Sequence, residues 1–232
     1  PRQPLYDNLY EDALMSYTFH QYQNTGDRSW PLMFPMVKSV VRAMDAVEQF
    51  AAAKRLPCSR GRFVINGASK RGWTTWMTAA TEDRRVAAIA PMVIDILHMP
   101  VSVPYQKHMY GSYSREIHDY VDLGLTDVLS SSKGGNLVDM VDPYAYRSSY
   151  TMPKWLMLST NDEFWTVDAV KNYMYGIPGL NRITYVPNAG HGMGDRKAVS
   201  SSLEAFFHYT IHGGKCPSCS SSVRVEGDIA SL

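Results

Sequence analysis

The sequence has 232 residues, of which 45% are hydrophobic and 19% charged, and this composition is typical of a folded globular protein rather than of a disordered chain or a collagen-like fibre. Lysine and arginine number 23, aspartate and glutamate 22, and the formal net charge is +1. Because no long block of like charge occurs, a nucleic acid is not an expected partner.

Two helices are predicted first along the chain. Apolar residues recur at roughly helical spacing between Tyr6 and Gln23, and the segment 24–27 breaks the pattern. After Trp30-Pro31, apolar residues at three- and four-residue steps run from Met36 to Phe50, and this pattern ends near Leu56-Pro57. The second segment is therefore predicted to be a long amphipathic helix.

Short apolar runs and helical patterns then alternate. The predicted strands are Phe63–Gly67, Val86–Ile94, Lys154–Ser159 and Arg182–Val186, and the helical patterns are Lys70–Thr81, Val167–Tyr175 and Arg196–His212. Periodicity alone leaves a buried helix open for Val86–Ile94, although such a run is typical of a central parallel strand. The alternation predicts the α/β class, with a mostly parallel sheet and helices on both of its faces.

Two segments fall outside this alternation. Residues 100–150 are rich in Tyr, Ser, Gly and Asp, carry one weak helical signal over Ser114–Leu123, and are predicted to form a cap or an insertion. From Gly213 the composition changes to a Cys- and Ser-rich stretch followed by the alternating segment Val223–Gly227. We therefore expect one domain over residues 1–212, and over residues 213–232 a linker with the start of a β-rich tail.

Targeting and redox signals are sparse. No apolar stretch approaches the ~18–20 residues of a membrane span, and no leader is visible, so the sequence leaves the localisation unknown. Cys58, Cys216 and Cys219 are too few for a disulfide framework, and the lone C-x-x-C lacks the second pair of a zinc site. A local disulfide or free thiols are expected, and neither a metal nor a cofactor is.

The segment 67–72, Gly-Ala-Ser-Lys-Arg-Gly, joins a predicted strand to a predicted helix. A sharp turn there exposes a serine hydroxyl and directs the next backbone N–H at a developing oxyanion, which is the arrangement of a nucleophile elbow. The usual pattern G-x-S-x-G has Gly two residues after the serine, whereas here Arg71 holds that place and Gly72 follows. Ser69 is thus a candidate nucleophile, and a helix-capping serine is the structural alternative.

Chain order supports a catalytic role for this serine. Asp162 lies just beyond the strand 154–159, and His191 lies just beyond the strand 182–186, which gives the order Ser, Asp, His of an α/β-hydrolase. The carboxyl ends of parallel strands are also where ligands gather. A surface position for His191 and a turn-capping role for Asp162 remain alternatives. The rival acids are Asp168, Glu163 and, above all, Asp95.

Other side chains are candidates for substrate contact. The N–H of Lys70 is expected to form half of an oxyanion hole, and the side chain of Lys70 or Arg71 is a candidate partner for an acidic substrate group, with solvated charges at a helix start as an equal alternative. Several aromatic residues are candidates to line a pocket under the cap, with packing in the core as the more common alternative for such side chains: Tyr105, Tyr110, Tyr113, Tyr120 and Trp165. The expected partner is a small-molecule or peptide substrate.

Six ordered segments also carry a family resemblance, namely 30–38, 67–73, 91–95, 141–144, 161–164 and 186–191. Together they resemble the PhoPQ-activated pathogenicity-related protein family, which has bacterial members and includes an autocrine proliferation repressor of social amoebae. The resemblance spans about residues 30–212. It implies an α/β-hydrolase fold with Ser69, Asp162 and His191 in the triad positions.

The resemblance also implies what lies outside this chain. Family members are longer at both ends and supply the first strands of the sheet there, so we interpret the chain as a fragment or a shortened isoform whose strand at Phe63 lies at an open edge. A secreted protein is expected from the resemblance alone. Two functions follow: a serine hydrolase acting through an acyl-enzyme, or a secreted signalling or binding protein on a catalytically retired hydrolase scaffold. The substrate and the oligomeric state stay open.

Overall fold

The structure is a computed structural model that describes residues 6–57, 61–130, 135–194, 196–214, 224–226 and 229–231. The three cysteines lie outside these residues, so the expectations for them stay predictions. The proposed division at residue 212 stays a prediction as well. No helix in the described ranges is long and apolar enough to cross a membrane.

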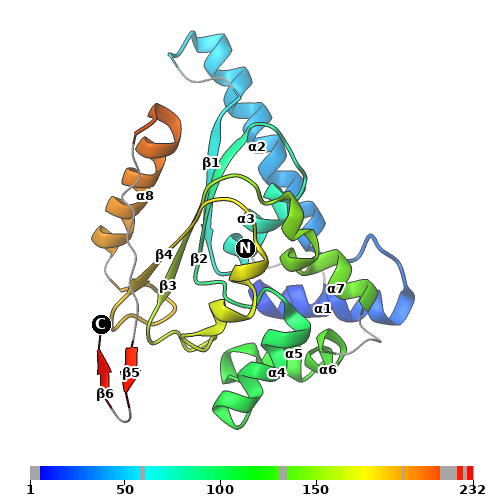
Figure 1. The fold of residues 1–232 in the computed structure, drawn as a ribbon. Coiled ribbons are helices and arrows are strands. Elements are labelled where there is room, and N and C mark those ends of the chain that lie inside the picture. The colour runs from blue at the N-terminus through cyan, green and yellow to red at the C-terminus, as the bar shows by residue number, and fades with distance from the viewer. Residues whose placement is uncertain are drawn as a thin grey trace.

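Four parallel strands form the central sheet (Figure 1). They are β1 (Phe63–Ala68), β2 (Val86–Met92), β3 (Lys154–Ser159) and β4 (Asn181–Val186), adjacent in that order. The register sets Ala68 beside Met92, and Ser159 beside Val186, so the carboxyl ends of the strands share one edge of the sheet. Three of the four predicted strands agree to within a residue, and the run at Val86 is a strand that ends two residues early.

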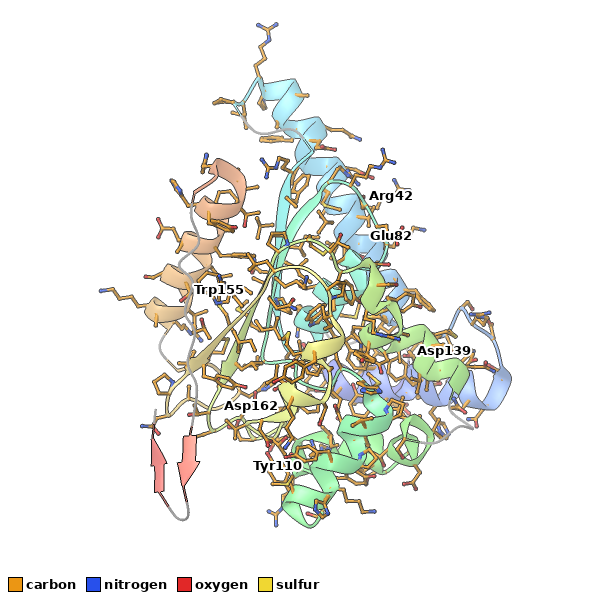
Figure 2. The ribbon with its side chains drawn as sticks, in the orientation of Figure 1. Arg42, Glu82, Tyr110, Asp139, Trp155 and Asp162 are labelled. Carbon is orange, nitrogen blue, oxygen red and sulfur yellow. The ribbon has the colours of Figure 1, made fainter. Side chains whose placement is uncertain are left out.

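Helices cover both faces of the sheet, as the sequence predicts. On one face α3 (Lys70–Ala79) packs on β1 and β2, and α2 (Met33–Lys54) packs on α3, whereas α8 (Arg196–His212) lies against the other face (Figure 1). Successive side chains of β2 point to opposite faces of the sheet, and both faces are apolar, so both are covered by helices. Ile89 belongs to the large core on the α3 side, while Ala88 and Ala90 pack against Phe206 of α8. Trp155, labelled in Figure 2, also contacts Phe206.

The remaining elements form a helical layer beside the sheet and two short terminal strands. The first helix α1 (Glu11–Thr25) follows a 3-10 turn, and it packs against α5, α6 and α7, which come from the segment before β3 (Figure 1). In chain order the other elements are η1 (Tyr6–Asn8), α4 (Met99–Tyr110), η2 (Arg115–Ile117), α5 (His118–Val121), α6 (Leu125–Leu129), α7 (Gly135–Val141), η4 (Pro143–Ser149), η5 (Ala169–Asn172), η6 (Met174–Gly176), β5 (Arg224–Glu226) and β6 (Ile229–Ser231).

The cap between β2 and β3 is more helical than the sequence predicts. Helix α4 contains two prolines and gives no clear periodic signal, but its start is held by the buried carboxylate of Asp142. Asp142 accepts hydrogen bonds from the backbone N–H groups of His98, at 3.1 Å, and Met99, at 2.7 Å. Because this capping group comes from more than forty residues later in the chain, a local pattern could not reveal the helix.

The predicted helix Val167–Tyr175 is wrong. The structure has two 3-10 turns there, η5 and η6, separated at Tyr173, whose φ of −141° is not helical. This departure accompanies the burial of the Tyr173 ring, which is 1% exposed, and its hydroxyl donates a hydrogen bond to Asp95 at 2.5 Å. A tertiary contact thus replaces the regular helix that the local pattern favours.

The buried pair of Asp95 and Tyr173 makes a prediction about stability. Burial raises the pKa of Asp95 from 3.8 to about 7, so the folded protein holds this proton more tightly than the unfolded chain does. The contribution of Asp95 to stability is full below the unfolded pKa and is lost as the pH rises through about 7. Between these two pKa values, the free energy of unfolding falls by up to about 1.4 kcal/mol per pH unit because of this group.

Asp95→Asn cannot ionise, so the loss of unfolding free energy between pH 5 and pH 8 should be smaller in this variant than in the wild type. Urea unfolding at the two pH values measures the difference. The exposed Asp139→Asn serves as the control and should behave like the wild type. An identical pH dependence in Asp95→Asn and the wild type would contradict the assignment.

Candidate active site

Ser69 occupies a sharp turn between the end of β1 and the start of α3. Its backbone has φ 56° and ψ −124°, a conformation that a residue with a side chain rarely adopts. The Ser69 N–H donates to the carbonyl of Met92 on β2 at 2.9 Å, which anchors the turn to the sheet. The strand-to-helix turn that the sequence predicts at this serine is therefore present.

Two glycines allow this turn to pack closely. A Cβ on Gly67 would lie 2.6 Å from the carbonyl oxygen of Arg71, and a Cβ on Gly72 would lie 2.8 Å from that of Met92. Arg71, which stands where the usual pattern has its second glycine, has a side chain that is 59% exposed and pairs with Glu11 of α1. The close approach therefore needs glycine three residues after the serine rather than two.

Asp162 and His191 meet beyond the ends of β3 and β4. The Nδ1 atom of His191 lies 2.9 Å from Oδ1 and 3.1 Å from Oδ2 of Asp162. The Asp162 side chain is 5% exposed, and its Oδ1 also accepts the N–H of Phe164 at 2.9 Å, which fixes the carboxylate. An Nδ1–H donated to Asp162 leaves the Nε2 of His191 as the free acceptor.

Neighbouring groups hold the histidine loop in place. The backbone N–H of His191 donates to Oε2 of Glu163 at 2.7 Å, and the Glu163 carboxylate also lies close to Gly190. The ring of Phe164 lies against the imidazole with 4.0 Å between centroids. The Nε2 atom of His191 is buried and has no hydrogen-bond partner among the residues that the structure describes.

The structure does not join Ser69 to His191. Within the described residues no hydrogen bond links the serine hydroxyl to Nε2. Ser69 follows β1 and His191 follows β4, which are the two outermost strands of the sheet. Two rival acids have other partners: Asp95 is bonded to Tyr173, while Asp168 accepts from Tyr105 and Lys171, each at 2.7 Å. Asp162 is thus the carboxylate that contacts the imidazole ring.

Lys70 and Arg71 form ion pairs with carboxylates of α1. The Nζ atom of Lys70 lies 2.6 Å from Asp12 and 3.3 Å from Glu11, and the Lys70 side chain is only 12% exposed. Arg71 donates both terminal nitrogens to Glu11, at 2.8 and 2.6 Å, and this pairing lowers the pKa of Glu11 to about 2. An acidic substrate group would have to displace these partners. The Lys70 N–H, at the first position of α3, has no intrahelical acceptor.

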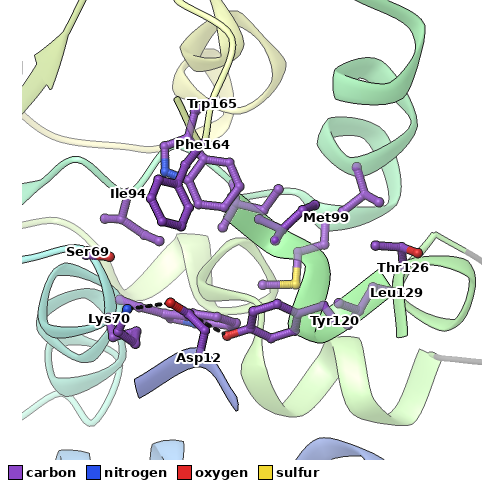
Figure 3. A pocket seen from close by; sticks show the side chains of 14 residues that line it. Asp12, Ser69, Lys70, Ile94, Met99, Tyr120, Thr126, Leu129, Phe164 and Trp165 are labelled. Atoms are coloured by element: carbon purple, nitrogen blue, oxygen red, sulfur yellow. Dashed lines mark hydrogen bonds and ion pairs between the residues drawn. The ribbon is translucent and has the colours of Figure 1, made fainter. Parts of the chain in front are cut away.

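A pocket opens beside Ser69 (Figure 3). Ser69 and Lys70 stand at one end and Thr126 and Leu129 at the other, in the view of Figure 3. Of the five aromatic candidates from the sequence, Tyr120 and Trp165 line this pocket and Tyr105, Tyr110 and Tyr113 do not. Asp12, Met99, Leu129 and Phe164 also line the pocket, and the sequence carries no sign of this because these side chains come from separate elements and share no local pattern.

No three His, Cys, Asp or Glu side chains within the described part of the chain lie close enough together to hold a metal ion. The expectation that the protein binds no metal stays a prediction.

Two solved structures share this arrangement of strands and helices. The chain is similar to an acetyl xylan esterase from Paenibacillus sp. R4, with 15% identity and a TM-score of 0.54 over 79% of this chain and 55% of that one. It is also similar to Est1E from Butyrivibrio proteoclasticus, with 14% identity and a TM-score of 0.52 over 78% of this chain and 71% of that one. The fold is therefore α/β-hydrolase-like, and at this identity the likeness speaks for the fold alone.

Sequence comparison gives the family. Autocrine proliferation repressor protein A of Dictyostelium discoideum is 35% identical over 240 residues, which cover 100% of this chain and 48% of that protein. The chain thus spans about half the length of this curated relative. The family model for the PhoPQ-activated pathogenicity-related protein matches residues 1–232. The chain accordingly belongs to the PhoPQ-activated pathogenicity-related protein family.

Proposed function

We propose that this chain carries the catalytic residues of a serine hydrolase that cleaves esters or amides through an acyl-enzyme. Ser69 is the nucleophile, His191 the general base and Asp162 the group that orients the imidazole. The observation that supports the proposal is the state of His191: Asp162 holds Nδ1 at 2.9 Å, while the buried Nε2 has no partner within the described part of the chain. A histidine held by one nitrogen, with the other unpaired, is prepared to take up a proton.

The steps follow from these roles. Nε2 of His191 accepts the proton of the Ser69 hydroxyl as Oγ bonds to the carbonyl carbon, and the Lys70 N–H donates to the oxyanion that forms. The bond from that carbon to the leaving oxygen or nitrogen then breaks, and His191 passes the proton to the leaving group. Water attacks the acyl-enzyme with His191 again as base, and Ser69 is regenerated.

The missing hydrogen bond between Ser69 and His191 has a physical explanation within this proposal. Catalytic hydrogen bonds are often long or poorly aligned before substrate binds. The buried Nε2 accepts no hydrogen bond from the described residues, and a buried acceptor without a donor is unfavourable unless a donor reaches it in some functional state. We infer that the Ser69 hydroxyl is this donor when substrate closes the site.

The alternative is a signalling or binding protein on a retired hydrolase scaffold. One observation favours it: the 35% identical relative carries the name of a proliferation repressor. A retired scaffold has no chemical reason to keep the Asp162–His191 pair together with a strained serine turn, so we favour the enzyme. The two experiments below separate the alternatives.

The first experiment labels the nucleophile. The full-length protein, exposed to a fluorophosphonate, should gain the mass of one adduct, and peptide mapping should place the adduct on Ser69. Ser69→Ala should abolish labelling, whereas the buried Ser102→Ala, away from the turn, should keep it. Labelling that persists in Ser69→Ala would exclude Ser69 as the nucleophile.

The second experiment measures turnover of an activated ester. His191→Ala should lower kcat by on the order of 10⁴, because the residues of a triad act as a unit. Asp162→Asn should cause a loss on a similar scale, about 10⁴, by favouring the wrong imidazole tautomer without disturbing the fold.

Matched controls are available in the chain. His118→Ala removes an exposed histidine, and Asp168→Asn removes the rival acid that pairs with Lys171. Both should keep kcat within about threefold of the wild type, since neither contacts the proposed site. A loss of less than about tenfold in folded His191→Ala would favour the binding-protein alternative.

A further inference from the structure

The lining of the pocket beside Ser69 is largely apolar and comes from several separate elements of the chain. Side chains that form its walls include Trp73 of α3, Ile94 after β2, Met99 of α4, Leu129 of α6 and Phe164 after β3. These residues belong to the large core or pack against it, so the walls are part of the folded interior. Because Ser69 lies at one end, a group attached to its oxygen would extend along these walls (Figure 3).

The two indole N–H groups of the lining are already paired within the protein. The indole N–H of Trp73 donates to the carbonyl of Val141 at 2.7 Å, and that of Trp165 donates to the carbonyl of Val93 at 3.3 Å. These two rings therefore present only carbon to a ligand.

The charged part of the wall is neutralised in the same way. Asp12 receives Nζ of Lys70 at 2.6 Å on one oxygen and the hydroxyl of Tyr120 at 3.0 Å on the other (Figure 3). Burial and the Asp12 carboxylate raise the pKa of Tyr120 well above its usual range, so its hydroxyl stays neutral and keeps donating. Lys70 lines the pocket, but its ammonium is already paired with Asp12 and is not available to a ligand carboxylate.

The size of the pocket limits what it can hold. Its free volume of about 50 Å³ is well below the ~150 Å³ of an apolar cavity that takes up benzene. A few methylene groups fit such a space, and a long alkyl chain does not.

We propose that this pocket binds the acyl group of the substrate and selects uncharged, apolar acyl groups of a few carbons, such as propionyl or butyryl, over long-chain and carboxylate-bearing ones. The inference rests on the proposed serine-hydrolase function, because it takes Ser69 as the acceptor of the acyl group. Asp12 acts as a specificity residue: it keeps Lys70 from recruiting an acidic acyl group.

The test uses the full-length protein and a series of esters that share one leaving group. From acetate to butyrate, kcat/KM should rise by about fourfold per methylene, because each buried methylene contributes free energy to the transition state. Octanoate should fall about tenfold below butyrate, and the succinate half-ester about a hundredfold below it. Octanoate or succinate as the best substrate would overturn the proposal.

Two variants connect the selectivity to the pocket. Leu129→Ala should enlarge its far end and raise the octanoate-to-butyrate ratio of kcat/KM about tenfold, and the milder Leu129→Val should act in the same direction if Leu129→Ala does not fold. Leu137→Ala is the matched control, since Leu137 is equally buried in the same core but does not line the pocket. An equal rise in the Leu137 variant would overturn the assignment.

The charge argument has its own variant. Asp12→Asn keeps an acceptor for Tyr120 but removes the charge that neutralises Lys70, so the succinate-to-butyrate ratio should rise about tenfold. Asp127 is an exposed residue of α6 that does not line the pocket, so Asp127→Asn serves as the control and should leave the succinate-to-butyrate ratio unchanged. A ratio unmoved by Asp12→Asn would contradict the specificity role of Asp12.

A binding measurement separates failure of this inference from failure of the proposed function. Pentan-2-one carries a propyl arm and needs no catalysis, and saturation-transfer NMR detects its binding. If no ester is hydrolysed but the ketone binds and Thr126→Phe, which fills the far end, prevents binding, the pocket assignment stands while the hydrolase proposal fails. If esters are hydrolysed but the acyl preference and ketone binding are the same in Thr126→Phe and the wild type, the pocket assignment is overturned.

Discussion

The close packing of α3 against β1 and β2 is the constraint on which the site depends. Glycine is required at positions 67 and 72, because the carbonyl oxygens of Arg71 and Met92 occupy the space that a Cβ would need. With the helix held so near the sheet, the chain has to turn sharply at Ser69, whose backbone conformation costs about 1–3 kcal/mol. The burial of Trp73 and Trp76 on the same helix offsets this strain. The strained serine is thus a consequence of packing.

Because the strands are parallel, the loops that follow them leave the sheet on the same side as Ser69, at the carboxyl ends of the strands. Since Ser159 is opposite Val186, the loops after β3 and β4 leave the sheet side by side, and Asp162 can meet His191. Glu163 and Phe164 follow Asp162 directly and hold the backbone and the ring of His191. One short segment therefore orients the imidazole, supports its loop and lines the pocket through Phe164.

The helical layer gives the site its chemical character. Helix α1 lies far from the sheet residues in sequence, yet Glu11 and Asp12 neutralise the two cations at the start of α3. The same layer supplies Tyr120 and Leu129 to the pocket. If Lys70 and Arg71 were unpaired, their charges next to Ser69 would favour an acidic substrate. Their ion pairs with Asp12 and Glu11 remove this preference, which is why we propose an apolar acyl group instead.

The sequence predicted those features that have a local pattern. The strands, the helices α2, α3 and α8, and the contact between Asp162 and His191 follow from apolar periodicity and from the order of loops along a parallel sheet. Helix α4 escaped prediction because its capping group is the distant Asp142. The segment at Tyr173 was predicted as a helix because its contact with Asp95 cannot be seen locally. The pairing of Lys70 with Asp12 was missed for the same reason.

The most direct test of the account is a crystal structure of the full-length protein after reaction with a small alkyl phosphonate. We expect the phosphorus on the Ser69 oxygen, the phosphoryl oxygen within hydrogen-bond distance of the Lys70 N–H, and the Nε2 of His191 at about 2.6–3.2 Å from the Ser69 oxygen. The alkyl group should enter the pocket toward Leu129. A phosphonate bound elsewhere, or Nε2 still buried and remote from an unmodified Ser69, would contradict the account.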